Sequence, residues 1–175
     1  MSHLFFIGYR GSGKSTVERL AAAKLQRPFL DSDALIEAAE SVSIPEIFAE
    51  RGEAAFRELE EEAVREAAAC SMPTVISLGG GAILRESNRE RIRSAGCAIW
   101  LRGSAESLYT RIQGDGDTKR PDLTDRGGYD EVVEMLKLRE PIYADLANLT
   151  VDTDKKAPDE ILNEIVRWLE TKSGA

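Results

Sequence analysis

The residues Gly-Tyr-Arg-Gly-Ser-Gly-Lys-Ser-Thr, at positions 8–16, match the phosphate-binding pattern G-x-x-x-x-G-K-[ST]. They follow the apolar run 4–7 and precede a segment of helical periodicity, which is the context that this pattern requires. Glycines let backbone N–H groups close around phosphate oxygens, and the lysine can bridge the outer phosphates. We therefore expect a nucleoside triphosphate to be bound by Gly11, Ser12, Gly13, Lys14, Ser15 and Thr16, with Mg²⁺ at the Ser15 hydroxyl.

Two carboxylates, Asp31 and Asp33, stand just past the second apolar run. Ligands of open α/β sheets gather at the carboxyl ends of the strands, so one carboxylate could serve Mg²⁺ and the other a hydroxyl of a phosphoryl acceptor. Serine and aspartate are also favoured at the N-cap of a helix, a role that Ser32 or Asp33 would fill well. The residues alone leave both interpretations open.

Three consecutive glycines, Gly79, Gly80 and Gly81, directly follow the third apolar run. Each glycine costs backbone entropy on folding, so a plain turn seldom needs three of them. Close approach of the backbone to a ligand is the better interpretation of this triplet.

Two arginines lie on or beside helical stripes. In the segment 129–147 apolar residues recur at helical spacing along one face, and Arg139 stands at one position of that face in place of an apolar residue. A guanidinium on such a stripe needs an anionic partner, either a structural carboxylate or the carboxylate of a substrate. Arg57 lies beside the apolar line of its own helix with Glu60 and Glu61 one turn on, so spacing alone favours a surface ion pair there.

The composition limits the class of protein. The chain has 175 residues, of which 42% are hydrophobic and 31% charged, and a net charge of −8, which fits one compact domain without the basic face of a nucleic-acid binder. Its apolar runs fall far short of the roughly 20 residues that span a bilayer, and we expect no signal peptide. Cys70 and Cys97 form no C-x-x-C pair and predict thiols in a reducing cytosol, and the single histidine, His3, argues against triads and zinc–histidine sites.

Five short apolar runs predict strands, at 4–7, 28–30, 74–78, 98–101 and 149–151. Segments of helical periodicity separate them, so we expect a parallel sheet with helices on both faces and right-handed crossovers. The stretch at about 112–129 is rich in glycine and charge and poor in apolar residues. An irregular segment of this length inside a compact domain predicts a mobile lid.

Taken together, these stretches resemble the shikimate kinase family, a small group of P-loop kinases similar to the nucleoside monophosphate kinases. The resemblance covers nearly the whole chain and rests on GYRGSGKST, DSD, SIPEIFAERGEAAFRELE, SLGGGAI, KRPDL and LREPIYADLA, in the family's order. It implies a three-layer α/β/α fold around a five-stranded parallel sheet. It also implies a single kinase domain over residues 1–175, with a substrate-binding region at about 32–61 and the lid at about 112–129.

The resemblance implies transfer of the γ-phosphoryl group of ATP to the 3-hydroxyl of shikimate, giving shikimate 3-phosphate and ADP on the path to chorismate and the aromatic amino acids. It implies catalytic roles for Lys14, Asp33 and Arg120. The implied ATP contacts add Arg111, Arg120 and Lys155 to the phosphate loop. The implied shikimate contacts are Asp33, Arg57, Gly79, Gly80, Gly81 and Arg139, and the implied Mg²⁺ ligands are Ser15 and Asp31.

The family also implies a cytoplasmic monomer whose partners are ATP, Mg²⁺ and shikimate, with no nucleic acid and no membrane among them. The chain departs from the family where Asp122 follows the Arg120-Pro121 pair in place of leucine, and where Lys155 replaces an arginine. Another small-molecule kinase, for gluconate or a nucleotide, would not need two carboxylate-binding arginines together with the glycine triplet. A GTP-dependent switch would need an N-K-x-D motif, which the sequence lacks, and a catalytically silent homologue would not need the whole set of charged residues.

Overall fold

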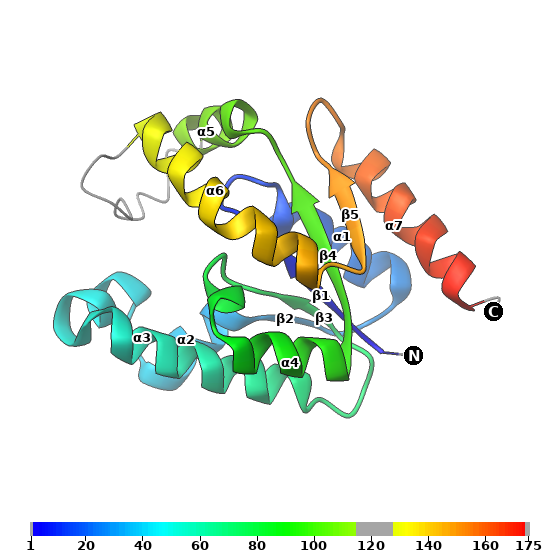
Figure 1. The fold of residues 1–175 in the computed structure, drawn as a ribbon. Helices are drawn as coiled ribbons and strands as arrows, with labels where there is room; N and C mark the ends of the chain where they lie inside the picture. The colour runs from blue at the N-terminus through cyan, green and yellow to red at the C-terminus, as the bar shows by residue number, and fades with distance from the viewer. Residues whose placement is uncertain (1, 115–127, 174–175) are drawn as a thin grey trace.

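The structure, a computed structural model, describes residues 2–114 and 128–173, which form one five-stranded sheet with parallel pairing throughout (Figure 1). The strands are β1 (His3–Ile7), β2 (Phe29–Asp31), β3 (Val75–Ser77), β4 (Gly96–Arg102) and β5 (Leu149–Asp152), and they lie in the order β2-β3-β1-β4-β5. All five predicted strands are confirmed, with bounds that shift by one or two residues.

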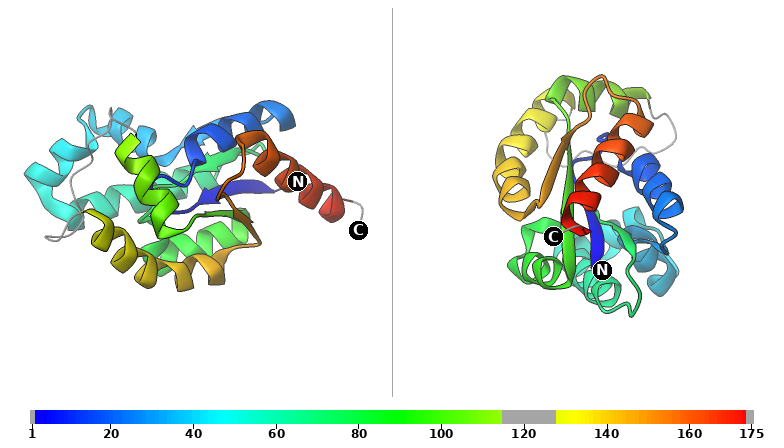
Figure 2. Two further views of the ribbon diagram at one scale, coloured as in Figure 1. Left: turned by 90° about the horizontal axis from the view of Figure 1, so that it is seen from above. Right: turned by 90° about the vertical axis from the view of Figure 1, so that its right-hand side faces the viewer.

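Helices cover both faces of the sheet, because the inner strands are apolar on both faces. Phe5 and Ile7 of β1 face one core, while Leu4 and Phe6 face the other, as strand alternation requires. The first core is closed by α3 (Ile44–Ala68), α4 (Glu86–Ala95) and α6 (Gly128–Leu146), and the second by α1 (Lys14–Leu25) and α7 (Pro158–Ser173) (Figure 2). The predicted three-layer α/β/α fold is confirmed.

The order of the strands determines where a ligand can bind. The chain leaves β1 toward β2, on one side of the sheet, whereas it leaves β3 toward β4, on the other side. Neighbouring parallel strands whose connections run in opposite directions form a switch point, and ligands of open α/β sheets bind at the carboxyl ends of such strands. The segment after β1 is the phosphate loop and the segment after β3 is the glycine triplet, so the two motifs emerge side by side.

The remaining helices extend from this same edge. α2 (Ser32–Glu40) packs against the first part of α3, and α5 (Ala105–Gly114) packs against α6 (Figure 1). A short 3₁₀ helix, η1 (Ala82–Leu84), follows the glycine triplet. α3 begins with a capping box, in which Ser43 and Glu46 satisfy each other's backbone N–H groups, and it bends at Gly52, whose φ of 75° and ψ of 177° are not helical.

Cys70 and Cys97 are both free thiols and partly buried, as the lack of a C-x-x-C pair predicts. Within the two described ranges, none of the helices has the length and apolar character that crossing a bilayer demands.

The inward face of α1 differs from the predicted apolar line. The sequence predicts Val17, Leu20, Ala21 and Leu25 on that face, but the structure turns Glu18 inward and leaves Leu20 and Leu25 only partly buried. The helix therefore packs an acid against the sheet, which the hydrophobic periodicity alone does not indicate.

Few interactions offset the free-energy cost of burying the Glu18 carboxyl group. Its side chain is fully buried, and neither carboxylate oxygen has a hydrogen bond of normal geometry within the described part of the chain. Burial raises the pKa of the Glu18 carboxyl to about 7, while the nearby Ser77 hydroxyl and Lys14 ammonium lower it to a smaller extent. The folded protein consequently keeps a proton on Glu18 at a pH at which the unfolded chain has released it.

We expect the substitution Glu18→Gln to stabilise the protein in alkaline solution much more than in acid. The contribution of Glu18 to stability is complete below pH 4.5 and is lost as the pH rises from about 4.5 to about 7, because only the unfolded chain ionises freely in that window. Urea unfolding at pH 5 and pH 8 should show the advantage of Glu18→Gln in unfolding free energy growing by about 2 kcal/mol. The exposed Glu170→Gln on α7 serves as the control, and an equal advantage of Glu18→Gln at both pH values would contradict the prediction.

Candidate active site

The phosphate loop meets α1 at an open helix terminus. Gly13 is the N-cap of α1, and its φ of 84° lies in the left-handed region that glycine adopts without strain. No side chain caps the helix there, and a Cβ at Gly13 would meet no atom within 4 Å. The N–H groups of the first helical turn therefore remain for an external anion, which the helix dipole also favours.

Lys14 folds back over the loop that precedes it. Its Nζ donates to the carbonyl oxygens of Gly8, at 2.7 Å, and Tyr9, at 3.2 Å. These two carbonyl oxygens are neutral acceptors, which are weaker partners for an ammonium than a phosphate oxygen. The role of Lys14 beside the outer phosphates stays a prediction.

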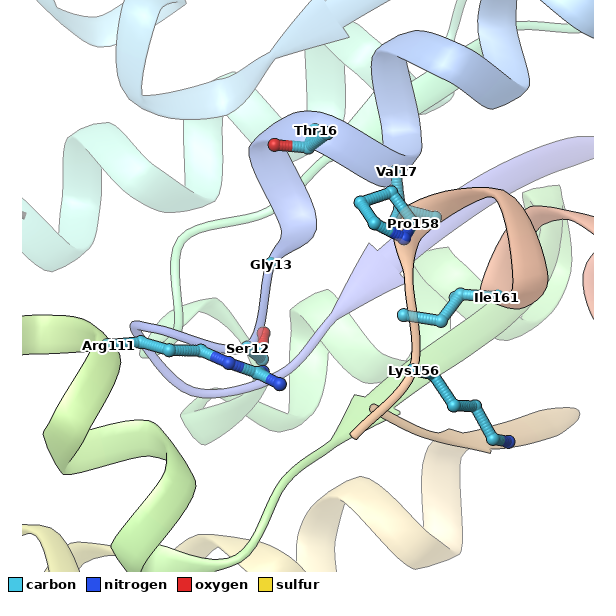
Figure 3. A pocket seen from close by; sticks show the side chains of 8 residues that line it. All are labelled: Ser12, Gly13, Thr16, Val17, Arg111, Lys156, Pro158 and Ile161. Atoms are coloured by element: carbon cyan, nitrogen blue, oxygen red, sulfur yellow. The ribbon is translucent and has the colours of Figure 1, made fainter. Parts of the chain in front are cut away.

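A pocket opens beside the loop, between α5 and the segment that joins β5 to α7 (Figure 3). Arg111 reaches from α5 to the loop at Ser12, and its guanidinium donates to the carbonyl oxygens of Gly11, at 3.3 Å, and Thr153, at 2.7 Å. The rest of the lining is Gly13, Thr16, Val17, Lys156, Pro158 and Ile161. The structure therefore brings the predicted Arg111 to the phosphate loop.

The predicted Lys155 lies outside this pocket. It lines an adjoining hollow together with Asp154 and Arg111, whereas its neighbour Lys156 lines the pocket beside the loop. Lys156 Nζ also pairs with Glu164 Oε1 at 2.6 Å. Sequence reasoning missed Lys156, because adjacent lysines in a loop cannot be told apart without the backbone conformation, and Lys155 takes a left-handed φ of 58° here.

The glycine triplet gives room to charged side chains from other elements. A Cβ at Gly79 would lie 2.7 Å from Asp33 Oδ1, and a Cβ at Gly81 would collide with the guanidinium of Arg57. The Gly79 N–H also donates to the Ser32 hydroxyl, at 3.2 Å, which ties the start of α2 to the triplet. The sequence predicts a close approach to a ligand here, and the structure adds that two polar side chains already approach the bare backbone.

Arg57 is mostly buried, so the surface position that spacing favours is wrong, whereas the ion pair with Glu60 that the same spacing predicts is confirmed. Its side chain is only 14% exposed, and it pairs with Glu60 and with Glu53, each at 2.9 Å. Glu61, the other predicted partner, pairs instead with arginines of the following helical segment. Arg57 is held between two carboxylates of α3 with its guanidinium at Gly81.

Arg139 lies on the other side of the triplet. It is buried on α6, donates to the carbonyl oxygen of Gly80 at 3.3 Å, and lies over the ring of Tyr9, 5.7 Å from the ring centre. Tyr143 also donates to the Gly80 carbonyl, at 2.8 Å. Among the described residues no carboxylate lies within salt-bridge distance of Arg139, so the structural acid that the sequence leaves open as its partner is not found there.

Glu60 is a site residue that sequence reasoning missed as such. It is fully buried on α3, and its Oε1 would lie 3.3 Å from a Cβ at Gly79. Burial raises the pKa of the Glu60 carboxyl, and the charges of Arg57 and Arg139 partly offset that rise. The sequence does indicate that Glu60 is unusual, because it falls on the inward-facing line of α3 between Phe56 and Ala63. An acid is rarely buried at such a position unless it has a partner.

The two aspartates after β2 have different structural roles. Asp31 is the N-cap of α2 and its Oδ1 accepts from the N–H groups of Asp33 and Ala34, so the N-cap role that the sequence leaves open belongs to Asp31 and not to Ser32 or Asp33. Asp31 caps because its extended backbone, with φ of −117° and ψ of 120°, ends the strand. Asp33 lies in the first turn and sends its carboxylate to Gly79.

The predicted lid falls largely outside the described residues. Arg120 and Asp122 lie outside them, and of the stretch 112–129 the structure describes only the end of α5 and the start of α6. The roles assigned to Arg120 remain predictions.

Comparison with known proteins identifies the group to which this site belongs. A family model described as shikimate kinase matches residues 10–170. The chain belongs to the shikimate kinase family. A shikimate kinase of Rhodopirellula baltica is 44% identical over 94% of this chain and 89% of its own length, and one of Symbiobacterium thermophilum is 39% identical over 97% of both.

Solved structures agree with this assignment to the shikimate kinases. A shikimate kinase from Acinetobacter baumannii in complex with shikimate superposes with a TM-score of 0.91 at 31% identity, covering 98% of this chain and 94% of that one. A shikimate kinase from Aquifex aeolicus gives 0.84 at 33% identity, covering 98% of each chain. A gluconokinase from Sinorhizobium meliloti shares the fold alone, with a TM-score of 0.63 at 19% identity over 98% of this chain and 95% of its own.

We expect Gly81→Ala to displace Arg57 without unfolding the protein. The backbone at Gly81 has a φ of −97°, which alanine accepts, and the atoms that the methyl group would meet are the movable end of a side chain. The KM for shikimate should rise roughly tenfold, as for loss of one charged hydrogen-bond partner, while the melting temperature changes little.

A double-mutant cycle gives the control for Gly81→Ala. In an Arg57→Ala background the methyl group has nothing to displace, so Gly81→Ala should then leave the KM for shikimate unchanged. A rise of the same size in both backgrounds would mean that the methyl group acts in another way.

Proposed function

We propose that the switch point of the sheet holds both substrates of a phosphoryl transfer, ATP on the phosphate loop and shikimate on the glycine triplet. A member of the shikimate kinase family phosphorylates shikimate with ATP, in the biosynthesis of aromatic compounds. The observation that carries the assignment of roles is the convergence of Asp33, Arg57 and Arg139 on Gly79–Gly81. One carboxylate and two guanidiniums suit an acceptor that has hydroxyl groups and a single carboxylate.

In this proposal Arg57 and Arg139 bind the carboxylate of shikimate, and Asp33 receives the hydroxyl groups. Glu53 and Glu60 hold Arg57 in place, while Gly80 holds Arg139 through its carbonyl. Both guanidiniums are thus oriented before the substrate binds, which favours a fixed position of the acceptor. We assign the substrate-binding region to about 32–61 and a single kinase domain to 1–175 on the same grounds.

On the donor side, the uncapped start of α1 and the residues Gly11–Thr16 receive the phosphates of ATP. Arg111, Lys156 and Pro158 border the pocket beside them, where the nucleoside would lie, and Lys155 lines the hollow beyond Arg111. Ser15 and Asp31 offer hydroxyl and carboxylate oxygens, the donor type that Mg²⁺ prefers. The N-cap contacts of Asp31 use only its Oδ1, so the residues fit a Mg²⁺ ion that, when bound, neutralises phosphate charge.

Catalysis in this arrangement comes from position and charge. Phosphoryl transfer passes through a loose transition state in most analyses, so alignment of the acceptor hydroxyl with the γ-phosphate and neutralisation of charge dominate over base catalysis. Lys14 would leave the carbonyl groups of Gly8 and Tyr9 for the outer phosphate oxygens. Asp33 orients the 3-hydroxyl of shikimate, and Arg120 would complete the charge around the phosphates from the lid.

We further propose a cytoplasmic monomer that uses no nucleic acid or membrane as a partner. The net charge of −8 and the free, unpaired state of both cysteines support this setting.

A coupled ADP-release assay tests the function directly. With ATP and Mg²⁺, shikimate should give turnover, whereas gluconate, an open-chain acid, and nucleoside monophosphates, which carry no carboxylate, should give little. Quinate, a cyclic polyhydroxy acid like shikimate, serves as the comparison that measures how strictly the site selects the ring. Absence of turnover with shikimate would refute the proposal, and faster turnover with gluconate would point to the rival small-molecule kinase.

Arg139→Ala should separate the two substrates. Loss of a charged hydrogen bond to the carboxylate is expected to weaken shikimate binding by roughly 30-fold or more, whereas Mg²⁺-ADP should bind with an unchanged Kd. Isothermal titration with each ligand measures both effects. Equal weakening of both ligands would show that Arg139 supports the site as a whole and does not bind the acceptor.

A further inference from the structure

Arg10 turns away from the phosphate loop and forms an ion pair with α6. Its Nη2 donates to Oε1 of Glu131 at 2.5 Å. Glu131 lies in the first turn of α6, and its side chain is 0% exposed, while that of Arg10 is 20% exposed. A carboxylate at that depth is strongly unfavourable without a cation, so this pair joins the loop to the helix.

Tyr9, the preceding residue of the loop, makes a second contact with the same helix. Its buried ring packs with Val132 and Leu136. Two guanidiniums lie within cation–π range of that ring, Arg10 at 5.8 Å and Arg139 at 5.7 Å. Because Arg139 follows Glu131 by about 12 Å along α6, the loop contacts the helix at two separated points.

These contacts connect the two halves of the reaction. The loop that carries Tyr9 and Arg10 also carries the residues that receive the phosphates of ATP. The helix that carries Glu131 also carries Arg139, the residue assigned to the carboxylate of the acceptor. In-line transfer tolerates little misplacement, since an error of about 1 Å can cost two orders of magnitude in rate.

We propose that Arg10 is a positioning residue, which through Glu131 sets α6 against the phosphate loop and thereby places Arg139, and the acceptor that it binds, in line with the γ-phosphate. This inference rests on the proposed role of Arg139. Tyr9 acts with it, as the ring against which the Arg139 guanidinium lies.

The test must remove the ion pair without leaving a buried charge. The double variant Arg10→Met with Glu131→Gln does so, because both replacements are neutral, glutamine has the shape of glutamate, and methionine keeps the unbranched apolar stem of arginine. We expect its KM for shikimate to rise about five- to tenfold and its kcat to fall, while the Kd for Mg²⁺-ADP stays within twofold of the wild type. Arg10→Lys, which keeps a cation, should retain most of the activity.

A second ion pair of the same helix provides a matched control. Arg93 of α4 pairs with Asp145, near the far end of α6, at 2.5 Å. The variant Arg93→Met with Asp145→Asn also removes a contact between α6 and another element, yet it should leave both the KM and the kcat unchanged, because it lies away from the loop.

Combination with Arg139→Ala separates positioning from general support of the fold. If Arg10 and Glu131 act through Arg139, the double variant Arg10→Met with Glu131→Gln should cause no further rise in the KM for shikimate in a protein that already carries Arg139→Ala. Three results would each overturn the inference. They are a rise in KM of the same size with and without Arg139→Ala, a KM of the double variant equal to that of the wild type, and equally weakened binding of Mg²⁺-ADP and shikimate. Shikimate turnover by the wild-type protein is measured first, so failure of the proposed function is recognised separately.

Discussion

The bare backbone at Gly79–Gly81 is the constraint on which the rest of the proposed acceptor site depends. Asp33 and Arg57 occupy space that side chains would fill at Gly79 and Gly81, and Arg139 bonds to the carbonyl of Gly80. Charged groups from three helices can meet there because the loop that follows β3 contributes no side chains of its own at these positions.

The sheet topology explains why this cluster lies beside the phosphate loop. The connections from β1 and β3 run to opposite sides, so the loops after both strands open at one switch point. The groups that we assign to the acceptor come from α2, α3 and α6, and those that we assign to the donor come from α1, α5 and the segment before α7. Each half of the site is therefore built from separate helices, and the two halves touch where Tyr9 and Arg10 meet α6.

The sequence is most informative where a single local rule acts. The five strands follow from short apolar runs, and the phosphate loop follows from its glycines and Lys14.

The sequence is least informative where the position of a side chain depends on contacts between segments that are distant along the chain. Spacing along one helix places Arg57 on the surface, since nothing in that spacing shows that Gly81 lies opposite. The buried acids Glu18 and Glu60 break the apolar pattern, and their environments depend on packing against β3 and the glycine triplet. Tyr9 and Arg10 occupy variable positions of the motif, so only the contact with α6 gives them a role.

The hydrogen bonds of Arg111 have a consequence for nucleotide recognition. Its guanidinium is anchored to the carbonyl of Gly11 and to both the hydroxyl and the carbonyl of Thr153, so contacts within the protein itself hold this long side chain in place. The rotamer entropy of an arginine is then lost during folding and is not subtracted from the affinity for ATP. One wall of the pocket that we assign to the nucleoside is accordingly formed by the fold itself.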